Sequence, residues 1–149
     1  MPLTDTIHSV LSNKGWGLFS VSPETTVYDA VQQMADRDIG ALAVIGPERL
    51  LGIFSERDYA RKIILLGRSS KETTVGEVMS YPATTVTPQE TVHDCLQMMT
   101  TYRLRHLVVT DQGHPVGMAS IGDLMKWIMS AQEDMIGHLH NYIAGSYTA

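Results

Sequence analysis

The chain has 149 residues, of which 44% are hydrophobic and 18% charged, so it has room for about one globular domain. Its net charge of −5 argues against broad nucleic-acid binding, because contacts that displace counterions need a basic face. No apolar run approaches the roughly 20 residues of a membrane-spanning helix, and the first residues lack the pattern of an export signal. With a single cysteine, these features favour a cytoplasmic protein without a membrane or nucleic-acid partner.

Hydrophobic spacing and turn residues divide the chain into short elements. The first half predicts a helix over residues 4–14, a strand over 18–21, a helix from Val27 to Arg37, strands over 41–45 and 50–54, and a helix over 56–66. A polar linker over 69–74 and a helical turn over 75–79 follow. The second half predicts a strand over 85–86, a helix through 92–99, strands over 107–109 and 116–119, and a last helix beginning near Ile121.

The second series repeats the first at a constant offset of 65 positions, from Val21–Ile63 to Val86–Ile128. A unit too small to bury its own apolar face must pack on its copy. We therefore expect an α/β (α+β) fold in which two β-α-β-β-α units pack sheet to sheet about an approximate twofold axis. The expected organisation is a single module over residues 1–149, with repeat 1 over 16–67, repeat 2 over 80–130 and a C-terminal helical extension over 131–149.

The extension carries apolar residues at helical spacing: Met135, Ile136, Leu139, Tyr142 and Ile143. This pattern predicts an amphipathic helix that packs on the module or on a second subunit. The apolar faces of the first and last helices have no obvious cover within the chain. We therefore expect a homodimer.

Both repeats end in a Gly-x-x-Ser-x-x-Asp motif, Gly52 to Asp58 and Gly117 to Asp123, where a strand turns into a helix. One interpretation is purely structural, because serine and an acid three residues later form a capping box. The other is functional: a helix N-terminus attracts an anion, and a carboxylate in the first turn accepts two hydrogen bonds from a cis-diol. Together these features suit a ribose phosphate, with Asp58 and Asp123 on the diol.

Because a carboxylate repels phosphate, the phosphate must bind to basic side chains and hydroxyls. In one cleft we expect Ser55, Arg57 and Arg61 in this role, and in the other Ser120 and Arg105 with His106 or Lys14. The residues around them form two local basic clusters, Arg57, Arg61, Lys62 and Arg68 in repeat 1 and Arg103, Arg105 and His106 in repeat 2. Each cluster can balance a small anionic ligand.

The duplicated unit resembles a tandem pair of cystathionine-β-synthase (CBS) domains. The resemblance rests on the two motifs above and on Ser22 to Val27 and Thr87 to Val92, which open equivalent helices. It implies a regulatory or sensor module that binds AMP, ADP, ATP, NAD or NADH, and less readily S-adenosylmethionine, in clefts between the repeats. Occupancy would be transmitted through a dimer interface or to an unidentified regulated protein. The chain departs from the family at Val108, where the family often has proline.

The resemblance also implies which segments face each motif. Ser120 and Asp123 would face residues 14–21, which include Lys14, Trp16, Ser20 and Val21. Ser55 and Asp58 would face residues 79–86, which include Met79, Tyr81, Pro82 and Thr84. Backbone groups of Ala41 and Ala43, or of His106 and Val108, would touch the adenine.

Other residues point to chemistry less strongly. Trp16 is equally compatible with ring stacking and with packing. Cys95 lies on a core-facing helix stripe and is expected to be a buried apolar residue, and His138 and His140, two apart on a helix, argue against a shared metal. No catalytic residues are predicted, because the chain lacks a nucleophile elbow, a phosphate loop and zinc spacing. The alternatives are a ligand-free structural dimerisation module and, least favoured, an enzyme that acts on a nucleotide.

Overall fold

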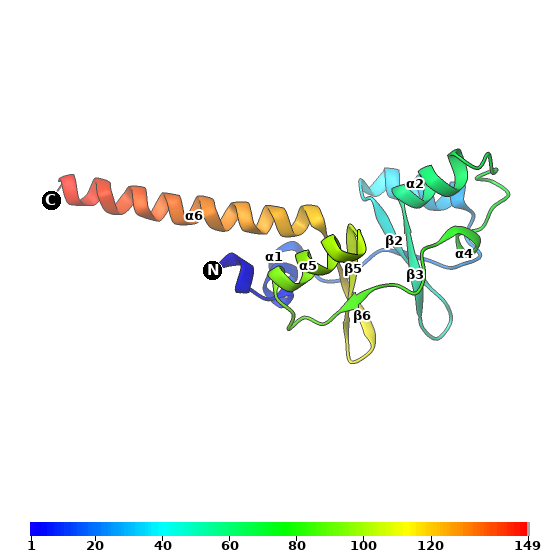
Figure 1. The fold of residues 1–149 in the computed structure, drawn as a ribbon, viewed down its shortest axis with the longest axis horizontal. Helices are drawn as coiled ribbons and strands as arrows, with labels where there is room; N and C mark the ends of the chain where they lie inside the picture. The colour runs from blue at the N-terminus through cyan, green and yellow to red at the C-terminus, as the bar shows by residue number, and fades with distance from the viewer. Residues whose placement is uncertain (149) are drawn as a thin grey trace.

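The computed structural model describes residues 1–148, and side chains through Asn141. Two three-stranded sheets form its centre (Figure 1). The first contains β1 (Ser20–Val21), β2 (Ala41–Ile45) and β3 (Leu50–Ser55), and the second β4 (Thr85–Val86), β5 (His106–Asp111) and β6 (His114–Ser120). In each sheet the first strand runs parallel to the second and the third antiparallel to it.

The two sheets share one register. Ala41 pairs with Ser55 in the first sheet and His106 with Ser120 in the second, so the 65-residue offset of the sequence is kept in space. Each central strand also has a register shift near its end, after Val44 and after Val109. The predicted duplication and mixed α+β fold are confirmed.

The helices that follow the first strands are also equivalent. α2 (Val27–Arg37) and α5 (Val92–Tyr102) each begin at a threonine whose hydroxyl accepts a hydrogen bond from the third amide of the helix. Each ends at a residue in the left-handed region, Asp38 with φ 53° and Arg103 with φ 56°. The first turn of both helices is therefore fixed by local sequence, and both helices stop at the equivalent place.

The helix after β3 differs from the prediction of a regular helix over 56–66. It consists of a short α3 (Glu56–Asp58) that continues as the π-helix η2 (Tyr59–Ile64). The widened winding is closed by a hydrogen bond from the Leu65 amide to the Ala60 carbonyl, five residues back. In repeat 2 the equivalent helix is the regular start of α6 (Ile121–Thr148).

Each repeat is completed by a helix from outside it. α1 (Ile7–Lys14), which follows the short 3₁₀ turn η1 (Pro2–Thr4), packs on the core of repeat 2, whereas α4 (Val75–Val78) packs on repeat 1. The Ile7 amide donates to the Glu90 carbonyl and the Val75 amide to that of Thr25, both at 2.8 Å. The expectation that the first helix lacks cover within the chain is therefore wrong, because Ile7 is fully buried against repeat 2.

A third, smaller core joins the two sheets. It contains Ala41, Ile53 and Val108, with Leu18 and Met118 packed against them. This contact is the seam between the repeats, and the polar ends of the strands lie around it.

α6 runs without a break from repeat 2 into the predicted extension and projects away from the module (Figure 1). Residues 132–140 are all exposed, so this segment does not pack on its own module as one of the two expected alternatives required. The side chains of Tyr142 and Ile143 lie outside the described residues. Within residues 1–148 no helix is long and apolar enough to cross a membrane.

Candidate functional site

The first Gly-x-x-Ser-x-x-Asp motif places a carboxylate at the start of α3. The Ser55 hydroxyl accepts a hydrogen bond from the Asp58 amide at 3.2 Å, and the Asp58 carboxylate in return accepts one from the Ser55 amide at 3.0 Å. This is the capping box expected from the spacing. The capping box fixes the rotamer of Asp58 and uses one carboxylate oxygen, so the second oxygen, Oδ1, is available to other partners.

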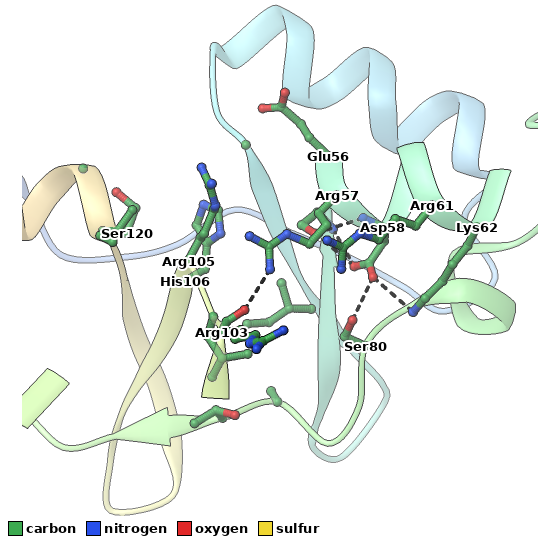
Figure 2. A pocket seen from close by; sticks show the side chains of 18 of the residues that line it. Glu56, Arg57, Asp58, Arg61, Lys62, Ser80, Arg103, Arg105, His106 and Ser120 are labelled. Carbon is green, nitrogen blue, oxygen red and sulfur yellow. Dashed lines mark hydrogen bonds and ion pairs between the residues drawn. The ribbon is translucent and has the colours of Figure 1, made fainter. Parts of the chain in front are cut away.

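The second oxygen of Asp58 is bound by Lys62, four residues further along the same helical segment, and by Ser80, from the segment that precedes β4. The Ser80 hydroxyl donates to Oδ1 at 2.8 Å, and the Lys62 ammonium lies 3.1 Å from the same atom (Figure 2). Asp58 is only 5% exposed, so both of its oxygens need these partners. The carboxylate is preorganised to accept hydrogen bonds from hydroxyl groups.

Asp58 lies at one end of a cavity of about 750 Å³ between the repeats, which we call the cationic cleft. Five of the eleven lysines and arginines of the chain line it: Arg57, Arg61, Lys62, Arg103 and Arg105. Its acidic lining consists of Glu56 and Asp58, and the Glu56 carboxylate points away from Asp58 (Figure 2). A cleft with a local excess of positive charge in a chain of net charge −5 is built to attract an anion.

The two repeats are tied together inside the cationic cleft. Arg57, at the start of α3, donates a hydrogen bond of 2.8 Å to the carbonyl of Arg103, which ends α5 (Figure 2). Arg105 and His106, from the start of β5, stand on the opposite side of the cleft from Asp58. The lining therefore comes from both repeats, and an anion bound here would contact both.

His106 is the titratable imidazole of this cleft. Burial lowers its pKa below the ordinary value of 6.5, an effect that Asp123 opposes and that Lys14, Arg105 and Arg57 reinforce. The neutral imidazole can donate and accept one hydrogen bond each, whereas a bound phosphate would favour the charged form.

The second motif has the same cap and a different partner. The Asp123 amide donates to the Ser120 hydroxyl at 3.0 Å, and the Asp123 carboxylate accepts from the Ser120 amide at 2.9 Å. Lys14, at the end of α1, lies 2.5 Å from the Asp123 carboxylate and also donates to the Met118 carbonyl at 2.7 Å. Burial raises the pKa of Asp123, but the Lys14 ammonium and the Ser120 groups outweigh it and hold this pKa below its ordinary value.

Asp123 and Lys14 lie outside the cationic cleft. They line a separate cavity of about 620 Å³ between α1 and α6, together with Trp127, whose indole donates to the Asp5 carboxylate at 3.0 Å. The two carboxylates of the repeated motif thus face different spaces.

The family model of the CBS domain matches the chain twice, over residues 16–65 and 75–130. The chain belongs to the CBS domain family. It is 40% identical over 151 residues to the CBS domain-containing protein CBSX3, mitochondrial, of Arabidopsis thaliana, a match that covers 95% of this chain and 73% of that protein. It is 33% identical over 105 residues to the CBS domain-containing protein YhcV of Bacillus subtilis, covering 70% and 74% of the two chains.

The fold is also shared with solved CBS structures. A structure from Burkholderia ambifaria MC40-6, named for its CBS domains and a proposed role in signal transduction, aligns with a TM-score of 0.82 at 41% identity. The alignment covers 85% of this chain and 96% of that one. The paired-repeat architecture is therefore that of a CBS pair.

The structure brings nine of the predicted site residues together around the cationic cleft: Ser55, Arg57, Asp58, Arg61, Pro82, Thr84, Arg105, His106 and Ser120. This grouping differs from the expected division, which assigned Arg105, His106 and Ser120 to a second cleft. The reason is geometric. β5 begins and β6 ends at the seam, so the polar residues of repeat 2 at these points open into the same space as α3.

The remaining predicted residues lie elsewhere. Val21, Ala41, Ala43 and Val108 are buried in the sheets, and Met79 packs against the core of repeat 1. Ser20 is exposed on β1, Tyr81 is 73% exposed and precedes a cis bond to Pro82, and Trp16 contacts His8 edge to face with ring centroids 5.2 Å apart. No group of three metal-ligating side chains gathers within the part of the chain that the structure describes.

Sequence reasoning left Lys62, Ser80 and Arg103 out of the site. Lys62 is four residues after Asp58, which is the spacing of a helical ion pair, and Arg103 belongs to a recognised basic cluster. These two could have been found from the sequence. Ser80 lies within residues 79–86, which the resemblance had placed opposite Asp58, but its individual contact depends on the long-range pairing of Ser80 with Ile53.

Proposed function

We propose that this CBS protein is a non-catalytic regulatory module that binds an adenine nucleotide or dinucleotide in the cationic cleft. The observation that carries the proposal is the combination of a preorganised, buried Asp58 and five cationic side chains in one cavity. Asp58 would accept the ribose hydroxyls, and Arg57, Arg61 and Arg105 would bind the phosphates. The Burkholderia ambifaria relative, which is named for signal transduction, supports regulation as the class of function.

The ribose contact would be an exchange of partners. Asp58 Oδ1 now accepts from the Ser80 hydroxyl and the Lys62 ammonium. A ribose diol supplies two O–H donors, which can take the place of the serine and leave Lys62 to move toward phosphate. Because like hydrogen bonds replace like, the exchange costs little free energy.

The apolar part of the lining suits a flat ring. Ile53, Ala83 and Leu104 line the cationic cleft beside its charged residues. A planar base could stack between aliphatic side chains there while its edge meets backbone groups. AMP, ADP, ATP, NAD and NADH share this layout of base, ribose and phosphate, and S-adenosylmethionine lacks the phosphate that the arginines would bind.

Ligand occupancy would be transmitted through Arg57. Its guanidinium now joins the repeats by donating to the Arg103 carbonyl, and a bound phosphate would compete for the same guanidinium. The ligand can shift the relation between the repeats only if it prefers one arrangement. A regulated protein or a second subunit would then read the altered surface.

The test is nucleotide binding by the purified chain, by thermal shift and calorimetry, with AMP, ADP, ATP, NAD, NADH, S-adenosylmethionine and GTP. A ligand present at about 100 times its dissociation constant should stabilise the fold by ~2.7 kcal/mol. Asp58→Asn and Arg57→Ala should each weaken the binding of that ligand about 10- to 100-fold, because each removes hydrogen bonds to or from a charged group.

Two variants serve as matched controls. Asp29, like Asp58, is the third residue of a helix capped by a hydroxyl side chain, but it is exposed and outside the cleft, so Asp29→Asn should bind like the parent. Arg49→Ala is the control for Arg57→Ala, because Arg49 is exposed in the β2–β3 turn, and it should also bind like the parent. The proposal is wrong if no nucleotide binds, which favours the ligand-free structural module, or if Asp58→Asn and Arg57→Ala both bind like the parent. Turnover of ATP or NAD that Asp58→Asn abolishes would instead indicate an enzyme.

A further inference from the structure

From Met125 onward, α6 carries an apolar surface that its own module does not cover. Met125, Met129, Met135, Ile136 and Leu139 are 45%, 55%, 61%, 67% and 59% exposed, and we call these five residues the α6 stripe. Other apolar side chains near the start of α6 are covered by the module: Leu124 is fully buried, and Trp127 packs on the core of repeat 2. The stripe therefore begins beside the module and continues where the helix projects from it (Figure 1).

In proteins, most of the stability of a helix comes from packing of its apolar face. Met129 and Ile136 of the α6 stripe are seven residues apart, and Met125 and Leu139 are fourteen apart, with the polar Gln132 midway between them. A seven-residue repeat of apolar positions is typical of a helix that pairs with another helix along a seam.

We propose that the α6 stripe is the contact surface for the α6 helix of a second copy of this chain, paired antiparallel about a twofold axis near residues 136 and 137. Polar groups beside the stripe that can hydrogen-bond across the pair, a carboxylate and an imidazole, support this occupant. Glu133 and His140 are seven residues apart, so they lie on the same flank of the stripe. In the antiparallel pair Glu133 of one copy lies opposite the partner's His140, and the two modules lie at opposite ends.

The size and charge of the surface fit a second copy better than a membrane. Covering five such side chains on each of two copies removes on the order of 1,000 Å² from water, the low end of the range for a specific complex. A membrane-surface helix would instead carry lysine and arginine on its polar face, whereas residues 131–141 contain Glu133 and Asp134 and no lysine or arginine.

The first experiment measures the mass of the full chain by sedimentation at concentrations up to roughly 100 μM, where an interface of this size should be populated. The parent should be a dimer, and Leu139→Glu should shift it to monomer by placing a charge in the seam. Asn141→Glu is the matched control, because it adds the same charge two residues away and off the stripe, and it should stay dimeric. A monomeric parent, or a Leu139→Glu variant that stays dimeric, overturns the proposal.

The second experiment tests the direction of pairing by cross-linking. Cys95 is fully buried, and burial raises the pKa of its thiol to about 12, so an introduced cysteine is the reactive one. Ile136→Cys should form a disulfide-linked dimer, whereas Met129→Cys should not, since its two copies would lie roughly 20 Å apart along the pair. If both variants cross-link, the helices pair in parallel and the proposed antiparallel arrangement is wrong. If neither variant cross-links, the two copies do not meet through this part of α6 and the proposal is wrong. Binding of the chain to phosphatidylcholine vesicles, abolished by Leu139→Glu, would identify a membrane surface in its place.

Discussion

The two repeats present the same motif in different surroundings. The side chain of Asp58 is 7% exposed and is held by the Ser80 hydroxyl and by Lys62 from its own helix, whereas the side chain of Asp123 is 23% exposed and is paired with Lys14 from α1. Arg57 follows Glu56 in the first motif, and Gly122 occupies the equivalent place in the second. A motif fixes where the carboxylate points, and the neighbours decide what it can bind.

The asymmetry extends to the charges around the seam. Arg103 and Arg105 belong to repeat 2 and yet line the cleft of Asp58, while repeat 1 contributes no cation to the cavity of Asp123. The duplication has therefore produced one strongly cationic cleft with contributions from both repeats. The second motif faces a cavity whose nearest cations, Lys14 and Lys126, are accompanied by Asp123 and Asp134.

The largest difference between the repeats is expected at their equivalent glycines. A Cβ on Gly52 would lie well under 3.0 Å from the backbone oxygen of Ser80, which cannot move without breaking the pairing of Ile53 with Ser80. A Cβ on Gly117 would lie 2.7 Å from Cδ1 of Leu11, a buried side-chain atom that can shift without breaking a hydrogen bond. Gly52→Ala should therefore cost about 3 kcal/mol of unfolding free energy, and Gly117→Ala about 1 kcal/mol, by urea denaturation.

The comparison carries its own control, because both substitutions add the same methyl group to the same position of a β3 or β6 strand. Equal losses would mean that the segment around Ser80 adapts as readily as the Leu11 side chain. A larger loss of unfolding free energy in Gly117→Ala would mean that the contact around Gly117 in repeat 2, and not that around Gly52 in repeat 1, is the tighter one.

Much of this arrangement follows from the sequence alone. The 65-residue offset predicts two equivalent sheets, and threonine followed three residues later by aspartate predicts the starts of α2 and α5. The serine and aspartate of each motif predict the caps that hold Asp58 and Asp123. The caps depend on hydrogen bonds between residues three positions apart, and the equivalence of the two sheets depends on the repeated sequence. Both can therefore be predicted without knowledge of long-range contacts.

What the sequence does not predict depends on contacts between distant segments. The crossing of α1 onto repeat 2 covers a helix face that looks unpartnered in the sequence. The meeting of the strand ends at the seam brings Arg105, His106 and Ser120 into the cleft of Asp58. The side on which a helix leaves the module, as α6 does, also depends on packing of Leu124 and Trp127 against repeat 2. Periodicity identifies an apolar face and does not say what covers it.

The next difference concerns pH, because His106 stands where repeat 1 has Ala41. Burial lowers the pKa of His106 below 6.5, so the unfolded chain binds its proton more readily than the folded chain does. This contribution to stability is present above pH 6.5 and is lost as the pH falls below that value. In urea denaturation between pH 7.5 and 5.5, His106→Gln should lose less stability than the parent, because glutamine does not titrate.

The corresponding control is His93→Gln, which removes an exposed imidazole from α5 outside the cationic cleft. It should follow the parent over the same pH range. A His106→Gln variant whose stability falls as steeply as that of the parent would assign the acid sensitivity to other groups.

The smallest expected effect comes from the two lysines that hold the repeated carboxylates. Lys14 and Asp123 form a partly exposed ion pair, with side chains 42% and 23% exposed, so Lys14→Met should cost less than about 1 kcal/mol at pH 7. Lys62→Met should cost about 1–2 kcal/mol, because it leaves Asp58 buried with one partner fewer and removes the bond from Lys62 to the Val78 carbonyl.

The lowered pKa of Asp123 adds a second measurement. Its contribution is present above pH 3.8 and is lost as the pH falls below that value, so Lys14→Met should flatten the acid limb of the stability curve. If Lys14→Met proves the more costly substitution, the ion pair between α1 and α6, rather than the carboxylate buried in the cationic cleft, is the stronger electrostatic tie in the molecule.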